Sequence, residues 1–182
     1  MIDATKTVTG QGGTTSISVD NLAKLFGGNK KLESVKAVDG VSFEVRDGEF
    51  FGLLGPNGAG KSTTINILTG NTKPTGGSAQ VGGYSVDSQL DKVKSVIGVC
   101  PQDPAVYKFL TGLENIEFFG KMHLMTKKEI NEQATILLDK LDLGVARKRK
   151  AKGYSGGMVR KLSLICAIIH SPDIVFLDEP TV

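Results

Sequence analysis

The sequence has only two cysteines and no long apolar run, and these scarcities exclude several classes of protein. Cys100 and Cys166 cannot build a scaffold of several disulfides, and both stand among apolar residues, which predicts buried free thiols in a reducing compartment. The longest apolar stretch, residues 162–169, is less than half as long as a bilayer span requires. Residues 1–20 are polar and carry no apolar signal core, so we expect neither secretion nor a membrane crossing by this chain.

The sequence also lacks a large excess of positive or negative charge. Lys and Arg number 22 against 19 Asp and Glu, and the net charge of +3 is too small to require nucleic acid or a membrane surface as a partner. The 40% hydrophobic content excludes disorder throughout, and the aperiodic placing of the glycines excludes collagen-like order. What remains is an ordinary globular composition, long enough for one domain with a sizeable core.

The amino-terminal part of the chain predicts a flexible tail followed by strands. Residues 1–15 show no periodicity, and we expect them to be mobile. Residues 16–22 and 41–45 alternate between apolar and polar, as half-buried strands do, and Asp47-Gly48 marks a tight turn typical of a hairpin. Residues 50–54 are apolar throughout, which indicates a central strand of an α/β sheet covered on both faces.

The middle of the chain has a helical pattern. Thr111-Gly-Leu-Glu114 and Thr126-Lys-Lys-Glu129 both show the capping-box spacing, a hydroxyl residue three positions before a Glu. After the second box, apolar residues recur at helical spacing as far as Leu141, and Gly144 ends that helix. We therefore expect a mostly helical insert over about residues 104–153.

Residues 55–62, Gly-Pro-Asn-Gly-Ala-Gly-Lys-Ser, match the pattern of a phosphate-binding loop. The glycines let successive backbone N–H groups point at phosphate oxygens, Lys61 places a charge near the β- and γ-phosphates, and the Ser62 hydroxyl can ligate Mg²⁺. An ordinary glycine-rich turn is the alternative, and the position between an apolar strand and a helix disfavours it. The pattern predicts a nucleoside triphosphate site formed by Gly55, Pro56, Asn57, Gly58, Ala59, Gly60, Lys61, Ser62 and Thr63.

A second candidate site lies at Asp178-Glu179. We expect a helix over roughly residues 156–170 and then an apolar strand over 173–178 that ends in these two carboxylates. Asp178 can hold Mg²⁺ through water, and Glu179 can accept a proton from an attacking water. A solvated acidic turn is the alternative, and it is disfavoured beside a phosphate loop because phosphoryl transfer needs both a metal ligand and a water-positioning group.

The segment Tyr154-Ser-Gly-Gly-Met158 predicts a second anion-binding helix start. Ser155 is a plausible N-cap, and Gly156 and Gly157 would present backbone donors at the head of the helix. Helix capping alone would also explain the motif. One nucleotide does not need two such cradles, whereas a head-to-tail dimer does, with the second cradle facing the partner's γ-phosphate.

These motifs occur in the order found in one family. The phosphate loop, Gln102 after an apolar strand, Ser155-Gly156-Gly157 and Asp178-Glu179 resemble the nucleotide-binding domains of ATP-binding cassette (ABC) transporters. The resemblance implies an α/β fold over residues 16–182, with a P-loop NTPase core, a mixed sheet carrying an antiparallel β subdomain, and a helical subdomain.

The segment Tyr154-Ser-Gly-Gly-Met158 corresponds to the signature motif of the family, and this motif and its surroundings indicate a particular type of ABC transporter. Tyr154 and Met158 depart from the commonest Leu-Ser-Gly-Gly-Gln form. Together with residues 98–104 and 113–119, they resemble the daunorubicin- and multidrug-resistance type of exporter.

The resemblance also implies roles for single residues. Phe26 would stack on adenine, and Lys61 would act on the phosphates during catalysis. Gln102 would contact Mg²⁺ and the attacking water, and Glu179 would be the general base. Ser155, Gly156 and Gly157 would act on the ATP of the partner protomer. The implied Mg²⁺ ligands are Ser62, Gln102 and Asp178.

The implied activity is ATP binding and hydrolysis that power a membrane exporter of drugs, lipids or similar substrates. The implied partners are a separate transmembrane permease, docked through the helical subdomain over about residues 104–160, and a second nucleotide-binding domain. The chain would then lie in the cytoplasm against the inner face of the membrane. No nucleic-acid partner is expected, because the basic run over residues 147–152 is interpreted as a solvated turn.

The family pattern continues beyond the acidic strand to a switch histidine. His123 and His170 are the two histidines of the sequence, and both precede Asp178. The chain therefore resembles a domain truncated at its carboxyl end, with terminal strands missing and with exposed sheet edges and apolar faces. Hydrolysis by this chain alone stays open.

Two alternatives remain. One is that the chain is a truncated fragment that binds ATP without turnover, and the other is that it is a cytosolic ABC ATPase acting on ribosomes or DNA. A single cassette, and a short Gln102-to-Ser155 spacing without a heptad array, disfavour the cytosolic type.

Overall fold

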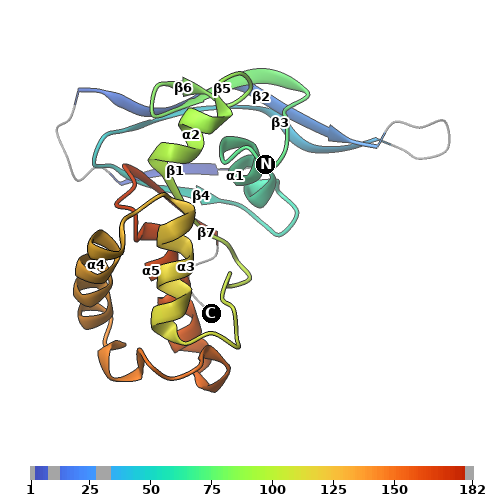
Figure 1. Cartoon of the computed structure of the whole chain (residues 1–182). Coiled ribbons are helices and arrows are strands. Elements are labelled where there is room, and N and C mark those ends of the chain that lie inside the picture. The colour runs from blue at the N-terminus through green and yellow to red at the C-terminus, as the bar shows by residue number, and fades with distance from the viewer. Residues whose placement is uncertain (1–2, 8–12, 28–33, 179–182) are drawn as a thin grey trace. The chain divides into compact units, whose positions relative to one another are not determined.

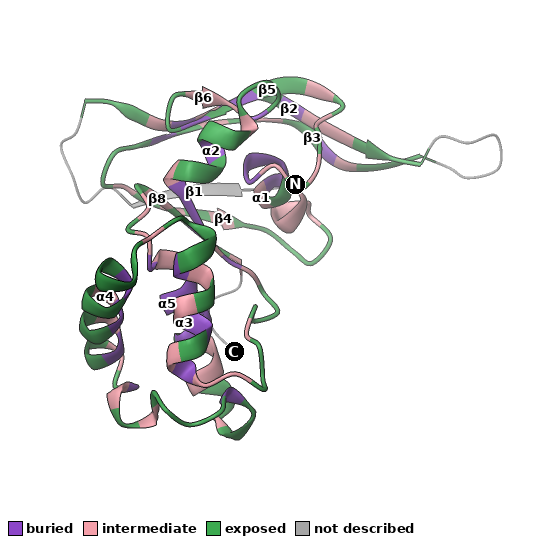
Figure 2. Ribbon diagram, viewed as in Figure 1, coloured by how far each residue is buried: buried purple, intermediate pink, exposed green. Residues whose placement is uncertain are grey.

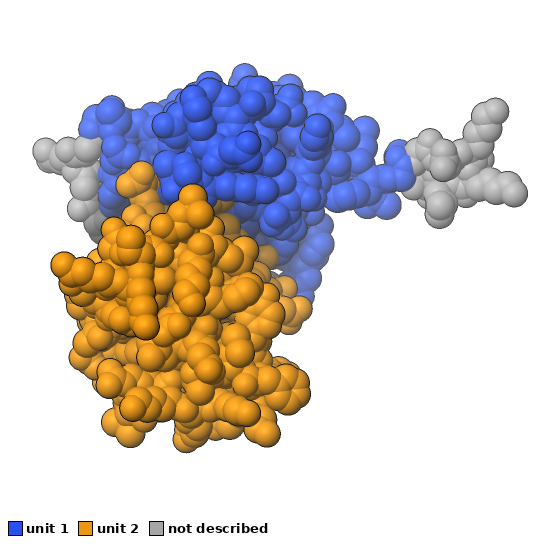
Figure 3. Space-filling model, in the orientation of Figure 1, with its two compact units in different colours: residues 1–96 blue, residues 97–182 orange. Residues whose placement is uncertain are grey.

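The computed structural model describes residues 3–7, 13–27 and 34–178. The chain divides into two compact units, residues 1–96 and residues 97–182, shown in blue and orange in Figure 3. Each unit is described by itself.

Unit 1 contains an antiparallel sheet in the strand order β3-β2-β5-β6 (Figure 1). Its strands are β2 (Thr15–Phe26), β3 (Val35–Arg46), β5 (Gly76–Val81) and β6 (Tyr84–Ser85). The two alternating runs pair antiparallel as β2 and β3, but the hairpin expected at Asp47-Gly48 is wrong, because that turn joins β3 to β4, which belongs to another sheet. Alternation places apolar residues on the buried face of the sheet: Ile17, Val19, Leu22, Val38, Val45, Ala79 and Val81.

The strand before the phosphate loop, β4 (Phe50–Leu54), pairs antiparallel with β1 (Asp3–Thr7). The flexible tail expected over residues 1–15 is therefore wrong for the β1 segment. Its threonines favour extended backbone, and the edge of β4 offers ladder partners.

The expectation that β4 is covered on both faces is also wrong. Phe50 and Leu54, which share one face of the strand, are 76% and 53% exposed. Phe51 on the opposite face of the strand stacks on Phe43 of β3, with ring centroids 4.8 Å apart. The exposed apolar faces expected from the sequence are thus present on this strand.

Unit 1 has two helices, α1 (Lys61–Leu68) and α2 (Leu90–Val96). Ile67 and Leu68 of α1 and Val93 of α2 are fully buried and complete the core of the unit.

Unit 2 combines three helices with a two-stranded parallel sheet (Figure 1). The helices are α3 (Gly112–Met122), α4 (Lys127–Lys140) and α5 (Gly156–Ile168), with the short 3₁₀ turns η1 (Gly144–Ala146) and η2 (Ala151–Gly153) between the last two. The strands β7 (Ile97–Cys100) and β8 (Ile174–Leu177) pair in parallel.

The helical prediction is confirmed except at one end: α4 ends at Lys140, with a left-handed Asp142 two residues later, so Gly144 does not end this helix. Both capping boxes form, Thr111 with Glu114 and Thr126 with Glu129, and each caps the start of its helix at the expected residue. In Figure 2 the buried positions of α4 lie on its side toward α3 and α5, and its outer side is exposed. The core of the unit consists of Ile116, Ile130, Ala134, Leu138, Leu143, Ala151, Leu162, Ile165, Cys166 and Ile169.

Cys100 and Cys166 are buried free thiols, as expected. Burial raises the pKa of the Cys166 thiol to about 12, so it stays protonated and unreactive at neutral pH. Within the described residues, none of the helices has the length and apolar character needed to cross a bilayer.

Candidate functional site

The phosphate loop joins β4 to α1 inside unit 1. The backbone is left-handed at Gly58 (φ 81°) and at Gly60 (φ 96°), a conformation that costs most other residues about 1–2 kcal/mol. A Cβ on Gly60 would also overlap the carbonyl oxygen of Ala37, whereas a Cβ on Gly58 would meet no atom within 4 Å. Glycine is therefore required at position 60 for two reasons: the left-handed backbone angle and the close approach of the loop to β3.

Helix α1 begins without a side-chain cap. Gly60 is its N-cap and has no side chain to cap the helix, and no acidic residue lies in the first turn. The first amides of a helix need an acceptor, and the helix dipole adds partial positive charge there. The start of α1 is thus suited to an anion rather than to a carboxylate of its own chain.

Lys61 lies over the same loop. Its ammonium donates to the carbonyl oxygens of Gly55 at 2.7 Å and of Pro56 at 3.0 Å. Thr64, buried one turn further on, donates its hydroxyl to the Gly60 carbonyl at 2.9 Å and fixes the loop to the helix. Together with Ser62 at the second helical position, these residues form one compact group suited to an anion.

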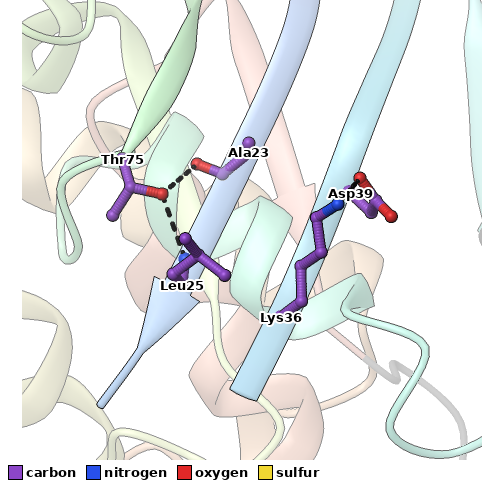
Figure 4. Close-up of polar contacts among 5 residues, drawn as sticks. All are labelled: Ala23, Leu25, Lys36, Asp39 and Thr75. Carbon is purple, nitrogen blue, oxygen red and sulfur yellow. Dashed lines mark hydrogen bonds and ion pairs between the residues drawn. The ribbon is translucent and has the colours of Figure 1, made fainter. Parts of the chain in front are cut away.

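Phe26 is the last residue of β2 and is 44% exposed. The strand end that carries it is anchored by Thr75, whose hydroxyl accepts from the Leu25 amide at 3.0 Å and donates to the Ala23 carbonyl at 3.2 Å (Figure 4). The Lys24 ammonium lies 4.9 Å from the Phe26 ring centroid. An exposed, anchored ring suits a stacking role, which for Phe26 stays a prediction.

In unit 2, the structure brings Gln102 and Asp178 to the same edge of the sheet. β7 and β8 pair in register from Ile97 with Ile174 to Cys100 with Leu177, and the Asp178 amide donates to the Cys100 carbonyl at 3.0 Å. The carboxyl ends of parallel strands are where such sheets gather ligands. Gln102 follows one of these ends and Asp178 follows the other.

Arg160 of α5 connects these two strand ends. Its guanidinium donates to the carbonyl oxygens of Pro101 and of Gln102, the latter at 2.9 Å, and to that of Asp178 at 2.9 Å. The sequence analysis missed this residue. The sequence pattern that could have identified Arg160 is its position on the same helix face as Ser163 and Ala167, three and seven positions later.

The second helix start is built differently from the first. The Ser155 hydroxyl accepts from the Met158 amide at 3.3 Å and caps α5. Gly156 and Gly157 are exposed, and a Cβ on either would meet no atom within 4 Å. No acidic residue lies in the first turn of α5, so an external anion can approach it.

The predicted residues are divided between the units. The phosphate loop and Phe26 lie in unit 1, whereas Gln102, the signature and Asp178 lie in unit 2. Glu179 lies outside the described residues. The predicted Mg²⁺ ligands, drawn from both units, therefore stay a prediction.

The donor chemistry of these ligands fits Mg²⁺. Ser62, Gln102 and Asp178 offer a hydroxyl, an amide oxygen and a carboxylate, and Mg²⁺ prefers oxygen ligands with one or two carboxylates and substrate phosphates. No group of three or more His, Cys, Asp or Glu side chains able to hold a metal occurs among the residues described. An ion held mainly by phosphate oxygens is consistent with that finding.

Comparison with known proteins identifies the family. A family model described as ABC transporter matches residues 38–182. The linearmycin resistance ATP-binding protein of Bacillus subtilis is 41% identical over 166 residues, which cover 91% of this chain and 51% of that protein. The daunorubicin/doxorubicin resistance ATP-binding protein of Streptomyces peucetius is 42% identical over 168 residues, covering 92% and 49%. The chain thus spans about half the length of these curated relatives.

Solved structures confirm the expected fold. An ATP-binding cassette in a dimeric post-hydrolysis state, bound to ADP and Pi, aligns with a TM-score of 0.78 and 26% identity over 91% of this chain and 74% of that one. The ATP-binding subunit of an ABC transporter aligns with a TM-score of 0.73 and 24% identity over 92% and 68%. The P-loop NTPase fold expected from the sequence is therefore correct, and the chain belongs to the ABC transporter family as an ATP-binding cassette.

Proposed function

We propose that this chain is the ATP-binding and ATP-hydrolysing subunit of an ABC exporter. The observation that carries the proposal is the phosphate loop, whose left-handed glycines lead into a helix without a side-chain cap, with the Lys61 ammonium above it. Backbone amides aimed at one point, with a fixed cation beside them, bind a triphosphate.

The chemistry is assigned to residues of this chain. Lys61 and the loop amides neutralise the β- and γ-phosphate oxygens, and Gln102 orients the attacking water. Glu179 accepts the proton of that water. Mg²⁺, held by Ser62, Gln102 and Asp178, supplies further neutralisation of phosphate charge when it is bound.

Dimerisation completes the proposed site. Two copies arranged head to tail would place the α5 start of one copy, with Ser155, Gly156 and Gly157, at the γ-phosphate held by the other. Two separate helix starts suited to anions support this arrangement. The solved cassette with ADP and Pi is described as dimeric, which also supports it.

The transport role rests on the relatives. Two of them are named for resistance to linearmycin and to daunorubicin and doxorubicin. We infer that this chain powers the outward movement of a drug, lipid or similar molecule through a separate permease. It would then lie on the cytoplasmic face of the membrane, with the permease setting the substrate.

A mixing experiment tests the composite site. Lys61→Met and Ser155→Arg each disable both sites of a homodimer, but a mixed dimer holds one site with a normal loop and a normal signature. Equal mixing makes half of the dimers mixed, so ATP turnover should return to roughly a quarter of the wild-type rate. Each variant alone should be inactive.

The outcomes separate the alternatives. Turnover by the single Ser155→Arg variant at the wild-type rate would remove the signature from the site. Tight binding of a fluorescent ATP analogue without turnover by the wild-type chain would favour the fragment that binds but does not hydrolyse. Failure to bind the analogue would overturn the nucleotide site itself.

A further inference from the structure

Strand β3 lies between the phosphate loop and the strand end that carries Phe26. The ladder of β2 with β3 skips Ala37, which forms a β-bulge. A Cβ on Gly60 would overlap the carbonyl oxygen of Ala37, so the phosphate loop lies against this bulge. Phe26 pairs with Val35, two residues before the bulge on the same strand. Two residues of strand extend over about 7 Å, so one nucleotide is long enough to reach from the loop to Phe26.

The end of β2 extends past its ladder with β5. That ladder ends at the pair of Ala23 with Gly76, so the Leu25 amide lies beyond the last paired residue of β5. The Thr75 hydroxyl accepts from this amide at 3.0 Å and donates to the Ala23 carbonyl at 3.2 Å (Figure 4). The Thr75 amide donates to the same carbonyl at 2.9 Å. A side chain thus replaces the backbone acceptor that β5 no longer supplies.

Lys24 adds a second link between the same two segments. Its ammonium donates to the Lys73 carbonyl at 2.7 Å and lies 4.9 Å from the centroid of the Phe26 ring. Pro74 has a fixed φ and stiffens the chain between Lys73 and Thr75. We call residues 73–75 the anchoring segment. Because the ammonium lies over one face of the ring, a base would stack on the opposite face.

We propose that Thr75 is a positioning residue for the nucleoside base. Its hydroxyl fixes the backbone at Leu25 and so holds the next residue, Phe26, where a base can stack on its ring. A ring that is already held in place loses less conformational entropy when a base binds. Thr75 therefore raises the affinity for ATP without touching it. The inference rests on the proposed function and deepens it, because it adds recognition of the base to recognition of the triphosphate.

Two ligands, ATP and inorganic tripolyphosphate, test the proposal by calorimetric titration of the 182-residue chain with Mg²⁺ present. Phe26→Ala removes the stacking partner and should weaken ATP binding about tenfold or more. Thr75→Val keeps the shape of the side chain but removes the hydroxyl, and it should weaken ATP binding about threefold to tenfold. Thr75→Ser keeps the hydroxyl and should bind ATP as the wild type does. Tripolyphosphate has no base, so its binding should be the same in all these variants.

A double variant and a matched control separate positioning from general support of the sheet. Thr75→Val added to Phe26→Ala should not weaken ATP binding further, because a hydroxyl that acts through the ring then has no ring to position. Ser42→Ala is the control, since the Ser42 hydroxyl accepts from another β2 amide, that of Asn21, at 2.8 Å. This variant loses the same kind of bond at a distance from Phe26 along β2, and its ATP affinity should equal that of the wild type.

Several results would overturn the proposal. They are wild-type ATP affinity in Thr75→Val or in Phe26→Ala, an equal loss for both ligands, and a full Thr75→Val effect without the Phe26 ring. An equal loss from Ser42→Ala would overturn it too, because any weakening of the sheet would then have the same result. If the wild-type chain bound neither ligand, the proposed nucleotide site would fail and this inference with it. Failure of the Thr75 variants alone would leave that site standing.

Discussion

The starts of helices α1 and α5, which we propose both contact ATP phosphates, satisfy their backbone amides in different ways. Helix α1 leaves its first amides without a side-chain cap, and the loop before it is shaped by glycine backbone angles at Gly58 and Gly60. Helix α5 is capped by the hydroxyl of Ser155, as α3 and α4 are capped by threonines. The start of α1 lacks a side-chain cap, whereas at α5 the Ser155 hydroxyl satisfies the Met158 amide and stabilises the helix start even before an anion binds.

Gly60→Ala should break the first helix start with the largest effect on stability. Alanine there combines a left-handed φ with overlap of the Ala37 carbonyl, so the free energy of unfolding should fall by about 3 kcal/mol. Gly58→Ala keeps the left-handed strain but meets open space, and it should cost about 1–2 kcal/mol. Urea unfolding of the two variants measures the difference. Equal costs would show that the loop does not approach β3 as closely as described.

Arg160→Met tests whether the Arg160 side chain stabilises the ends of β7 and β8 in unit 2. The variant removes a cation that donates to three carbonyl oxygens at the ends of β7 and β8, so unfolding should become easier by about 2–3 kcal/mol. Lys161→Met is the neighbouring control, because its exposed ion pair with Asp142 at 3.7 Å contributes about 0.5 kcal/mol or less. Hydrogen exchange at residues 97–102 should rise in Arg160→Met alone. If the Lys161 variant lost as much stability, Arg160 would not be what holds the strand ends together.

Ser155→Ala and Gly156→Ala sharpen the comparison because their effects on stability have opposite signs. Loss of the Ser155 cap should cost about 1 kcal/mol. An alanine at Gly156 meets nothing within 4 Å and should stabilise α5 by up to about 1 kcal/mol. If the α5 start faces a partner's nucleotide, both variants should nevertheless lower ATP turnover. Full turnover by the stabilised Gly156→Ala protein would leave the motif a helix cap and nothing more.

The sequence was sufficient for features that depend on neighbouring residues. Both capping boxes and the apolar strand before Asp178 follow from local spacing, and the structure confirms them. The phosphate loop could be predicted for the same reason, since its shape depends on its own glycines.

Features that depend on distant residues were missed. Arg160 donates hydrogen bonds to carbonyl groups 58 and 59 positions before it, and no local sequence pattern predicts those partners. The β1–β4 pairing joins the first residues to a strand more than 40 positions later, so a tail without periodicity was expected instead.

Acid should affect unit 2 more than unit 1, and this is the smallest effect we expect. His123 and His170, both in unit 2, are the two histidines of the chain, and their rings stack with centroids 3.5 Å apart. Burial, and then the charge of His170, lower the pKa of His123. Burial also lowers the pKa of His170, although its bond to the Ile97 carbonyl opposes the shift. The stacked pair is therefore stable in its neutral form.

A depressed histidine pKa fixes the sign of the pH dependence. The contribution of the pair to stability is fully present above the unfolded pKa of about 6.5 and is lost as the pH falls through the lower folded values, because the unfolded chain then binds more protons. Hydrogen exchange at the ends of α3 and α5 should therefore quicken between pH 7 and pH 5, while the buried amides of β2 in unit 1 hold their protection. His123→Phe keeps a flat ring against His170 and removes one of the two protons, so the acid-induced change should shrink. An unchanged response in that variant would assign the acid sensitivity to carboxylates rather than to the stacked histidines.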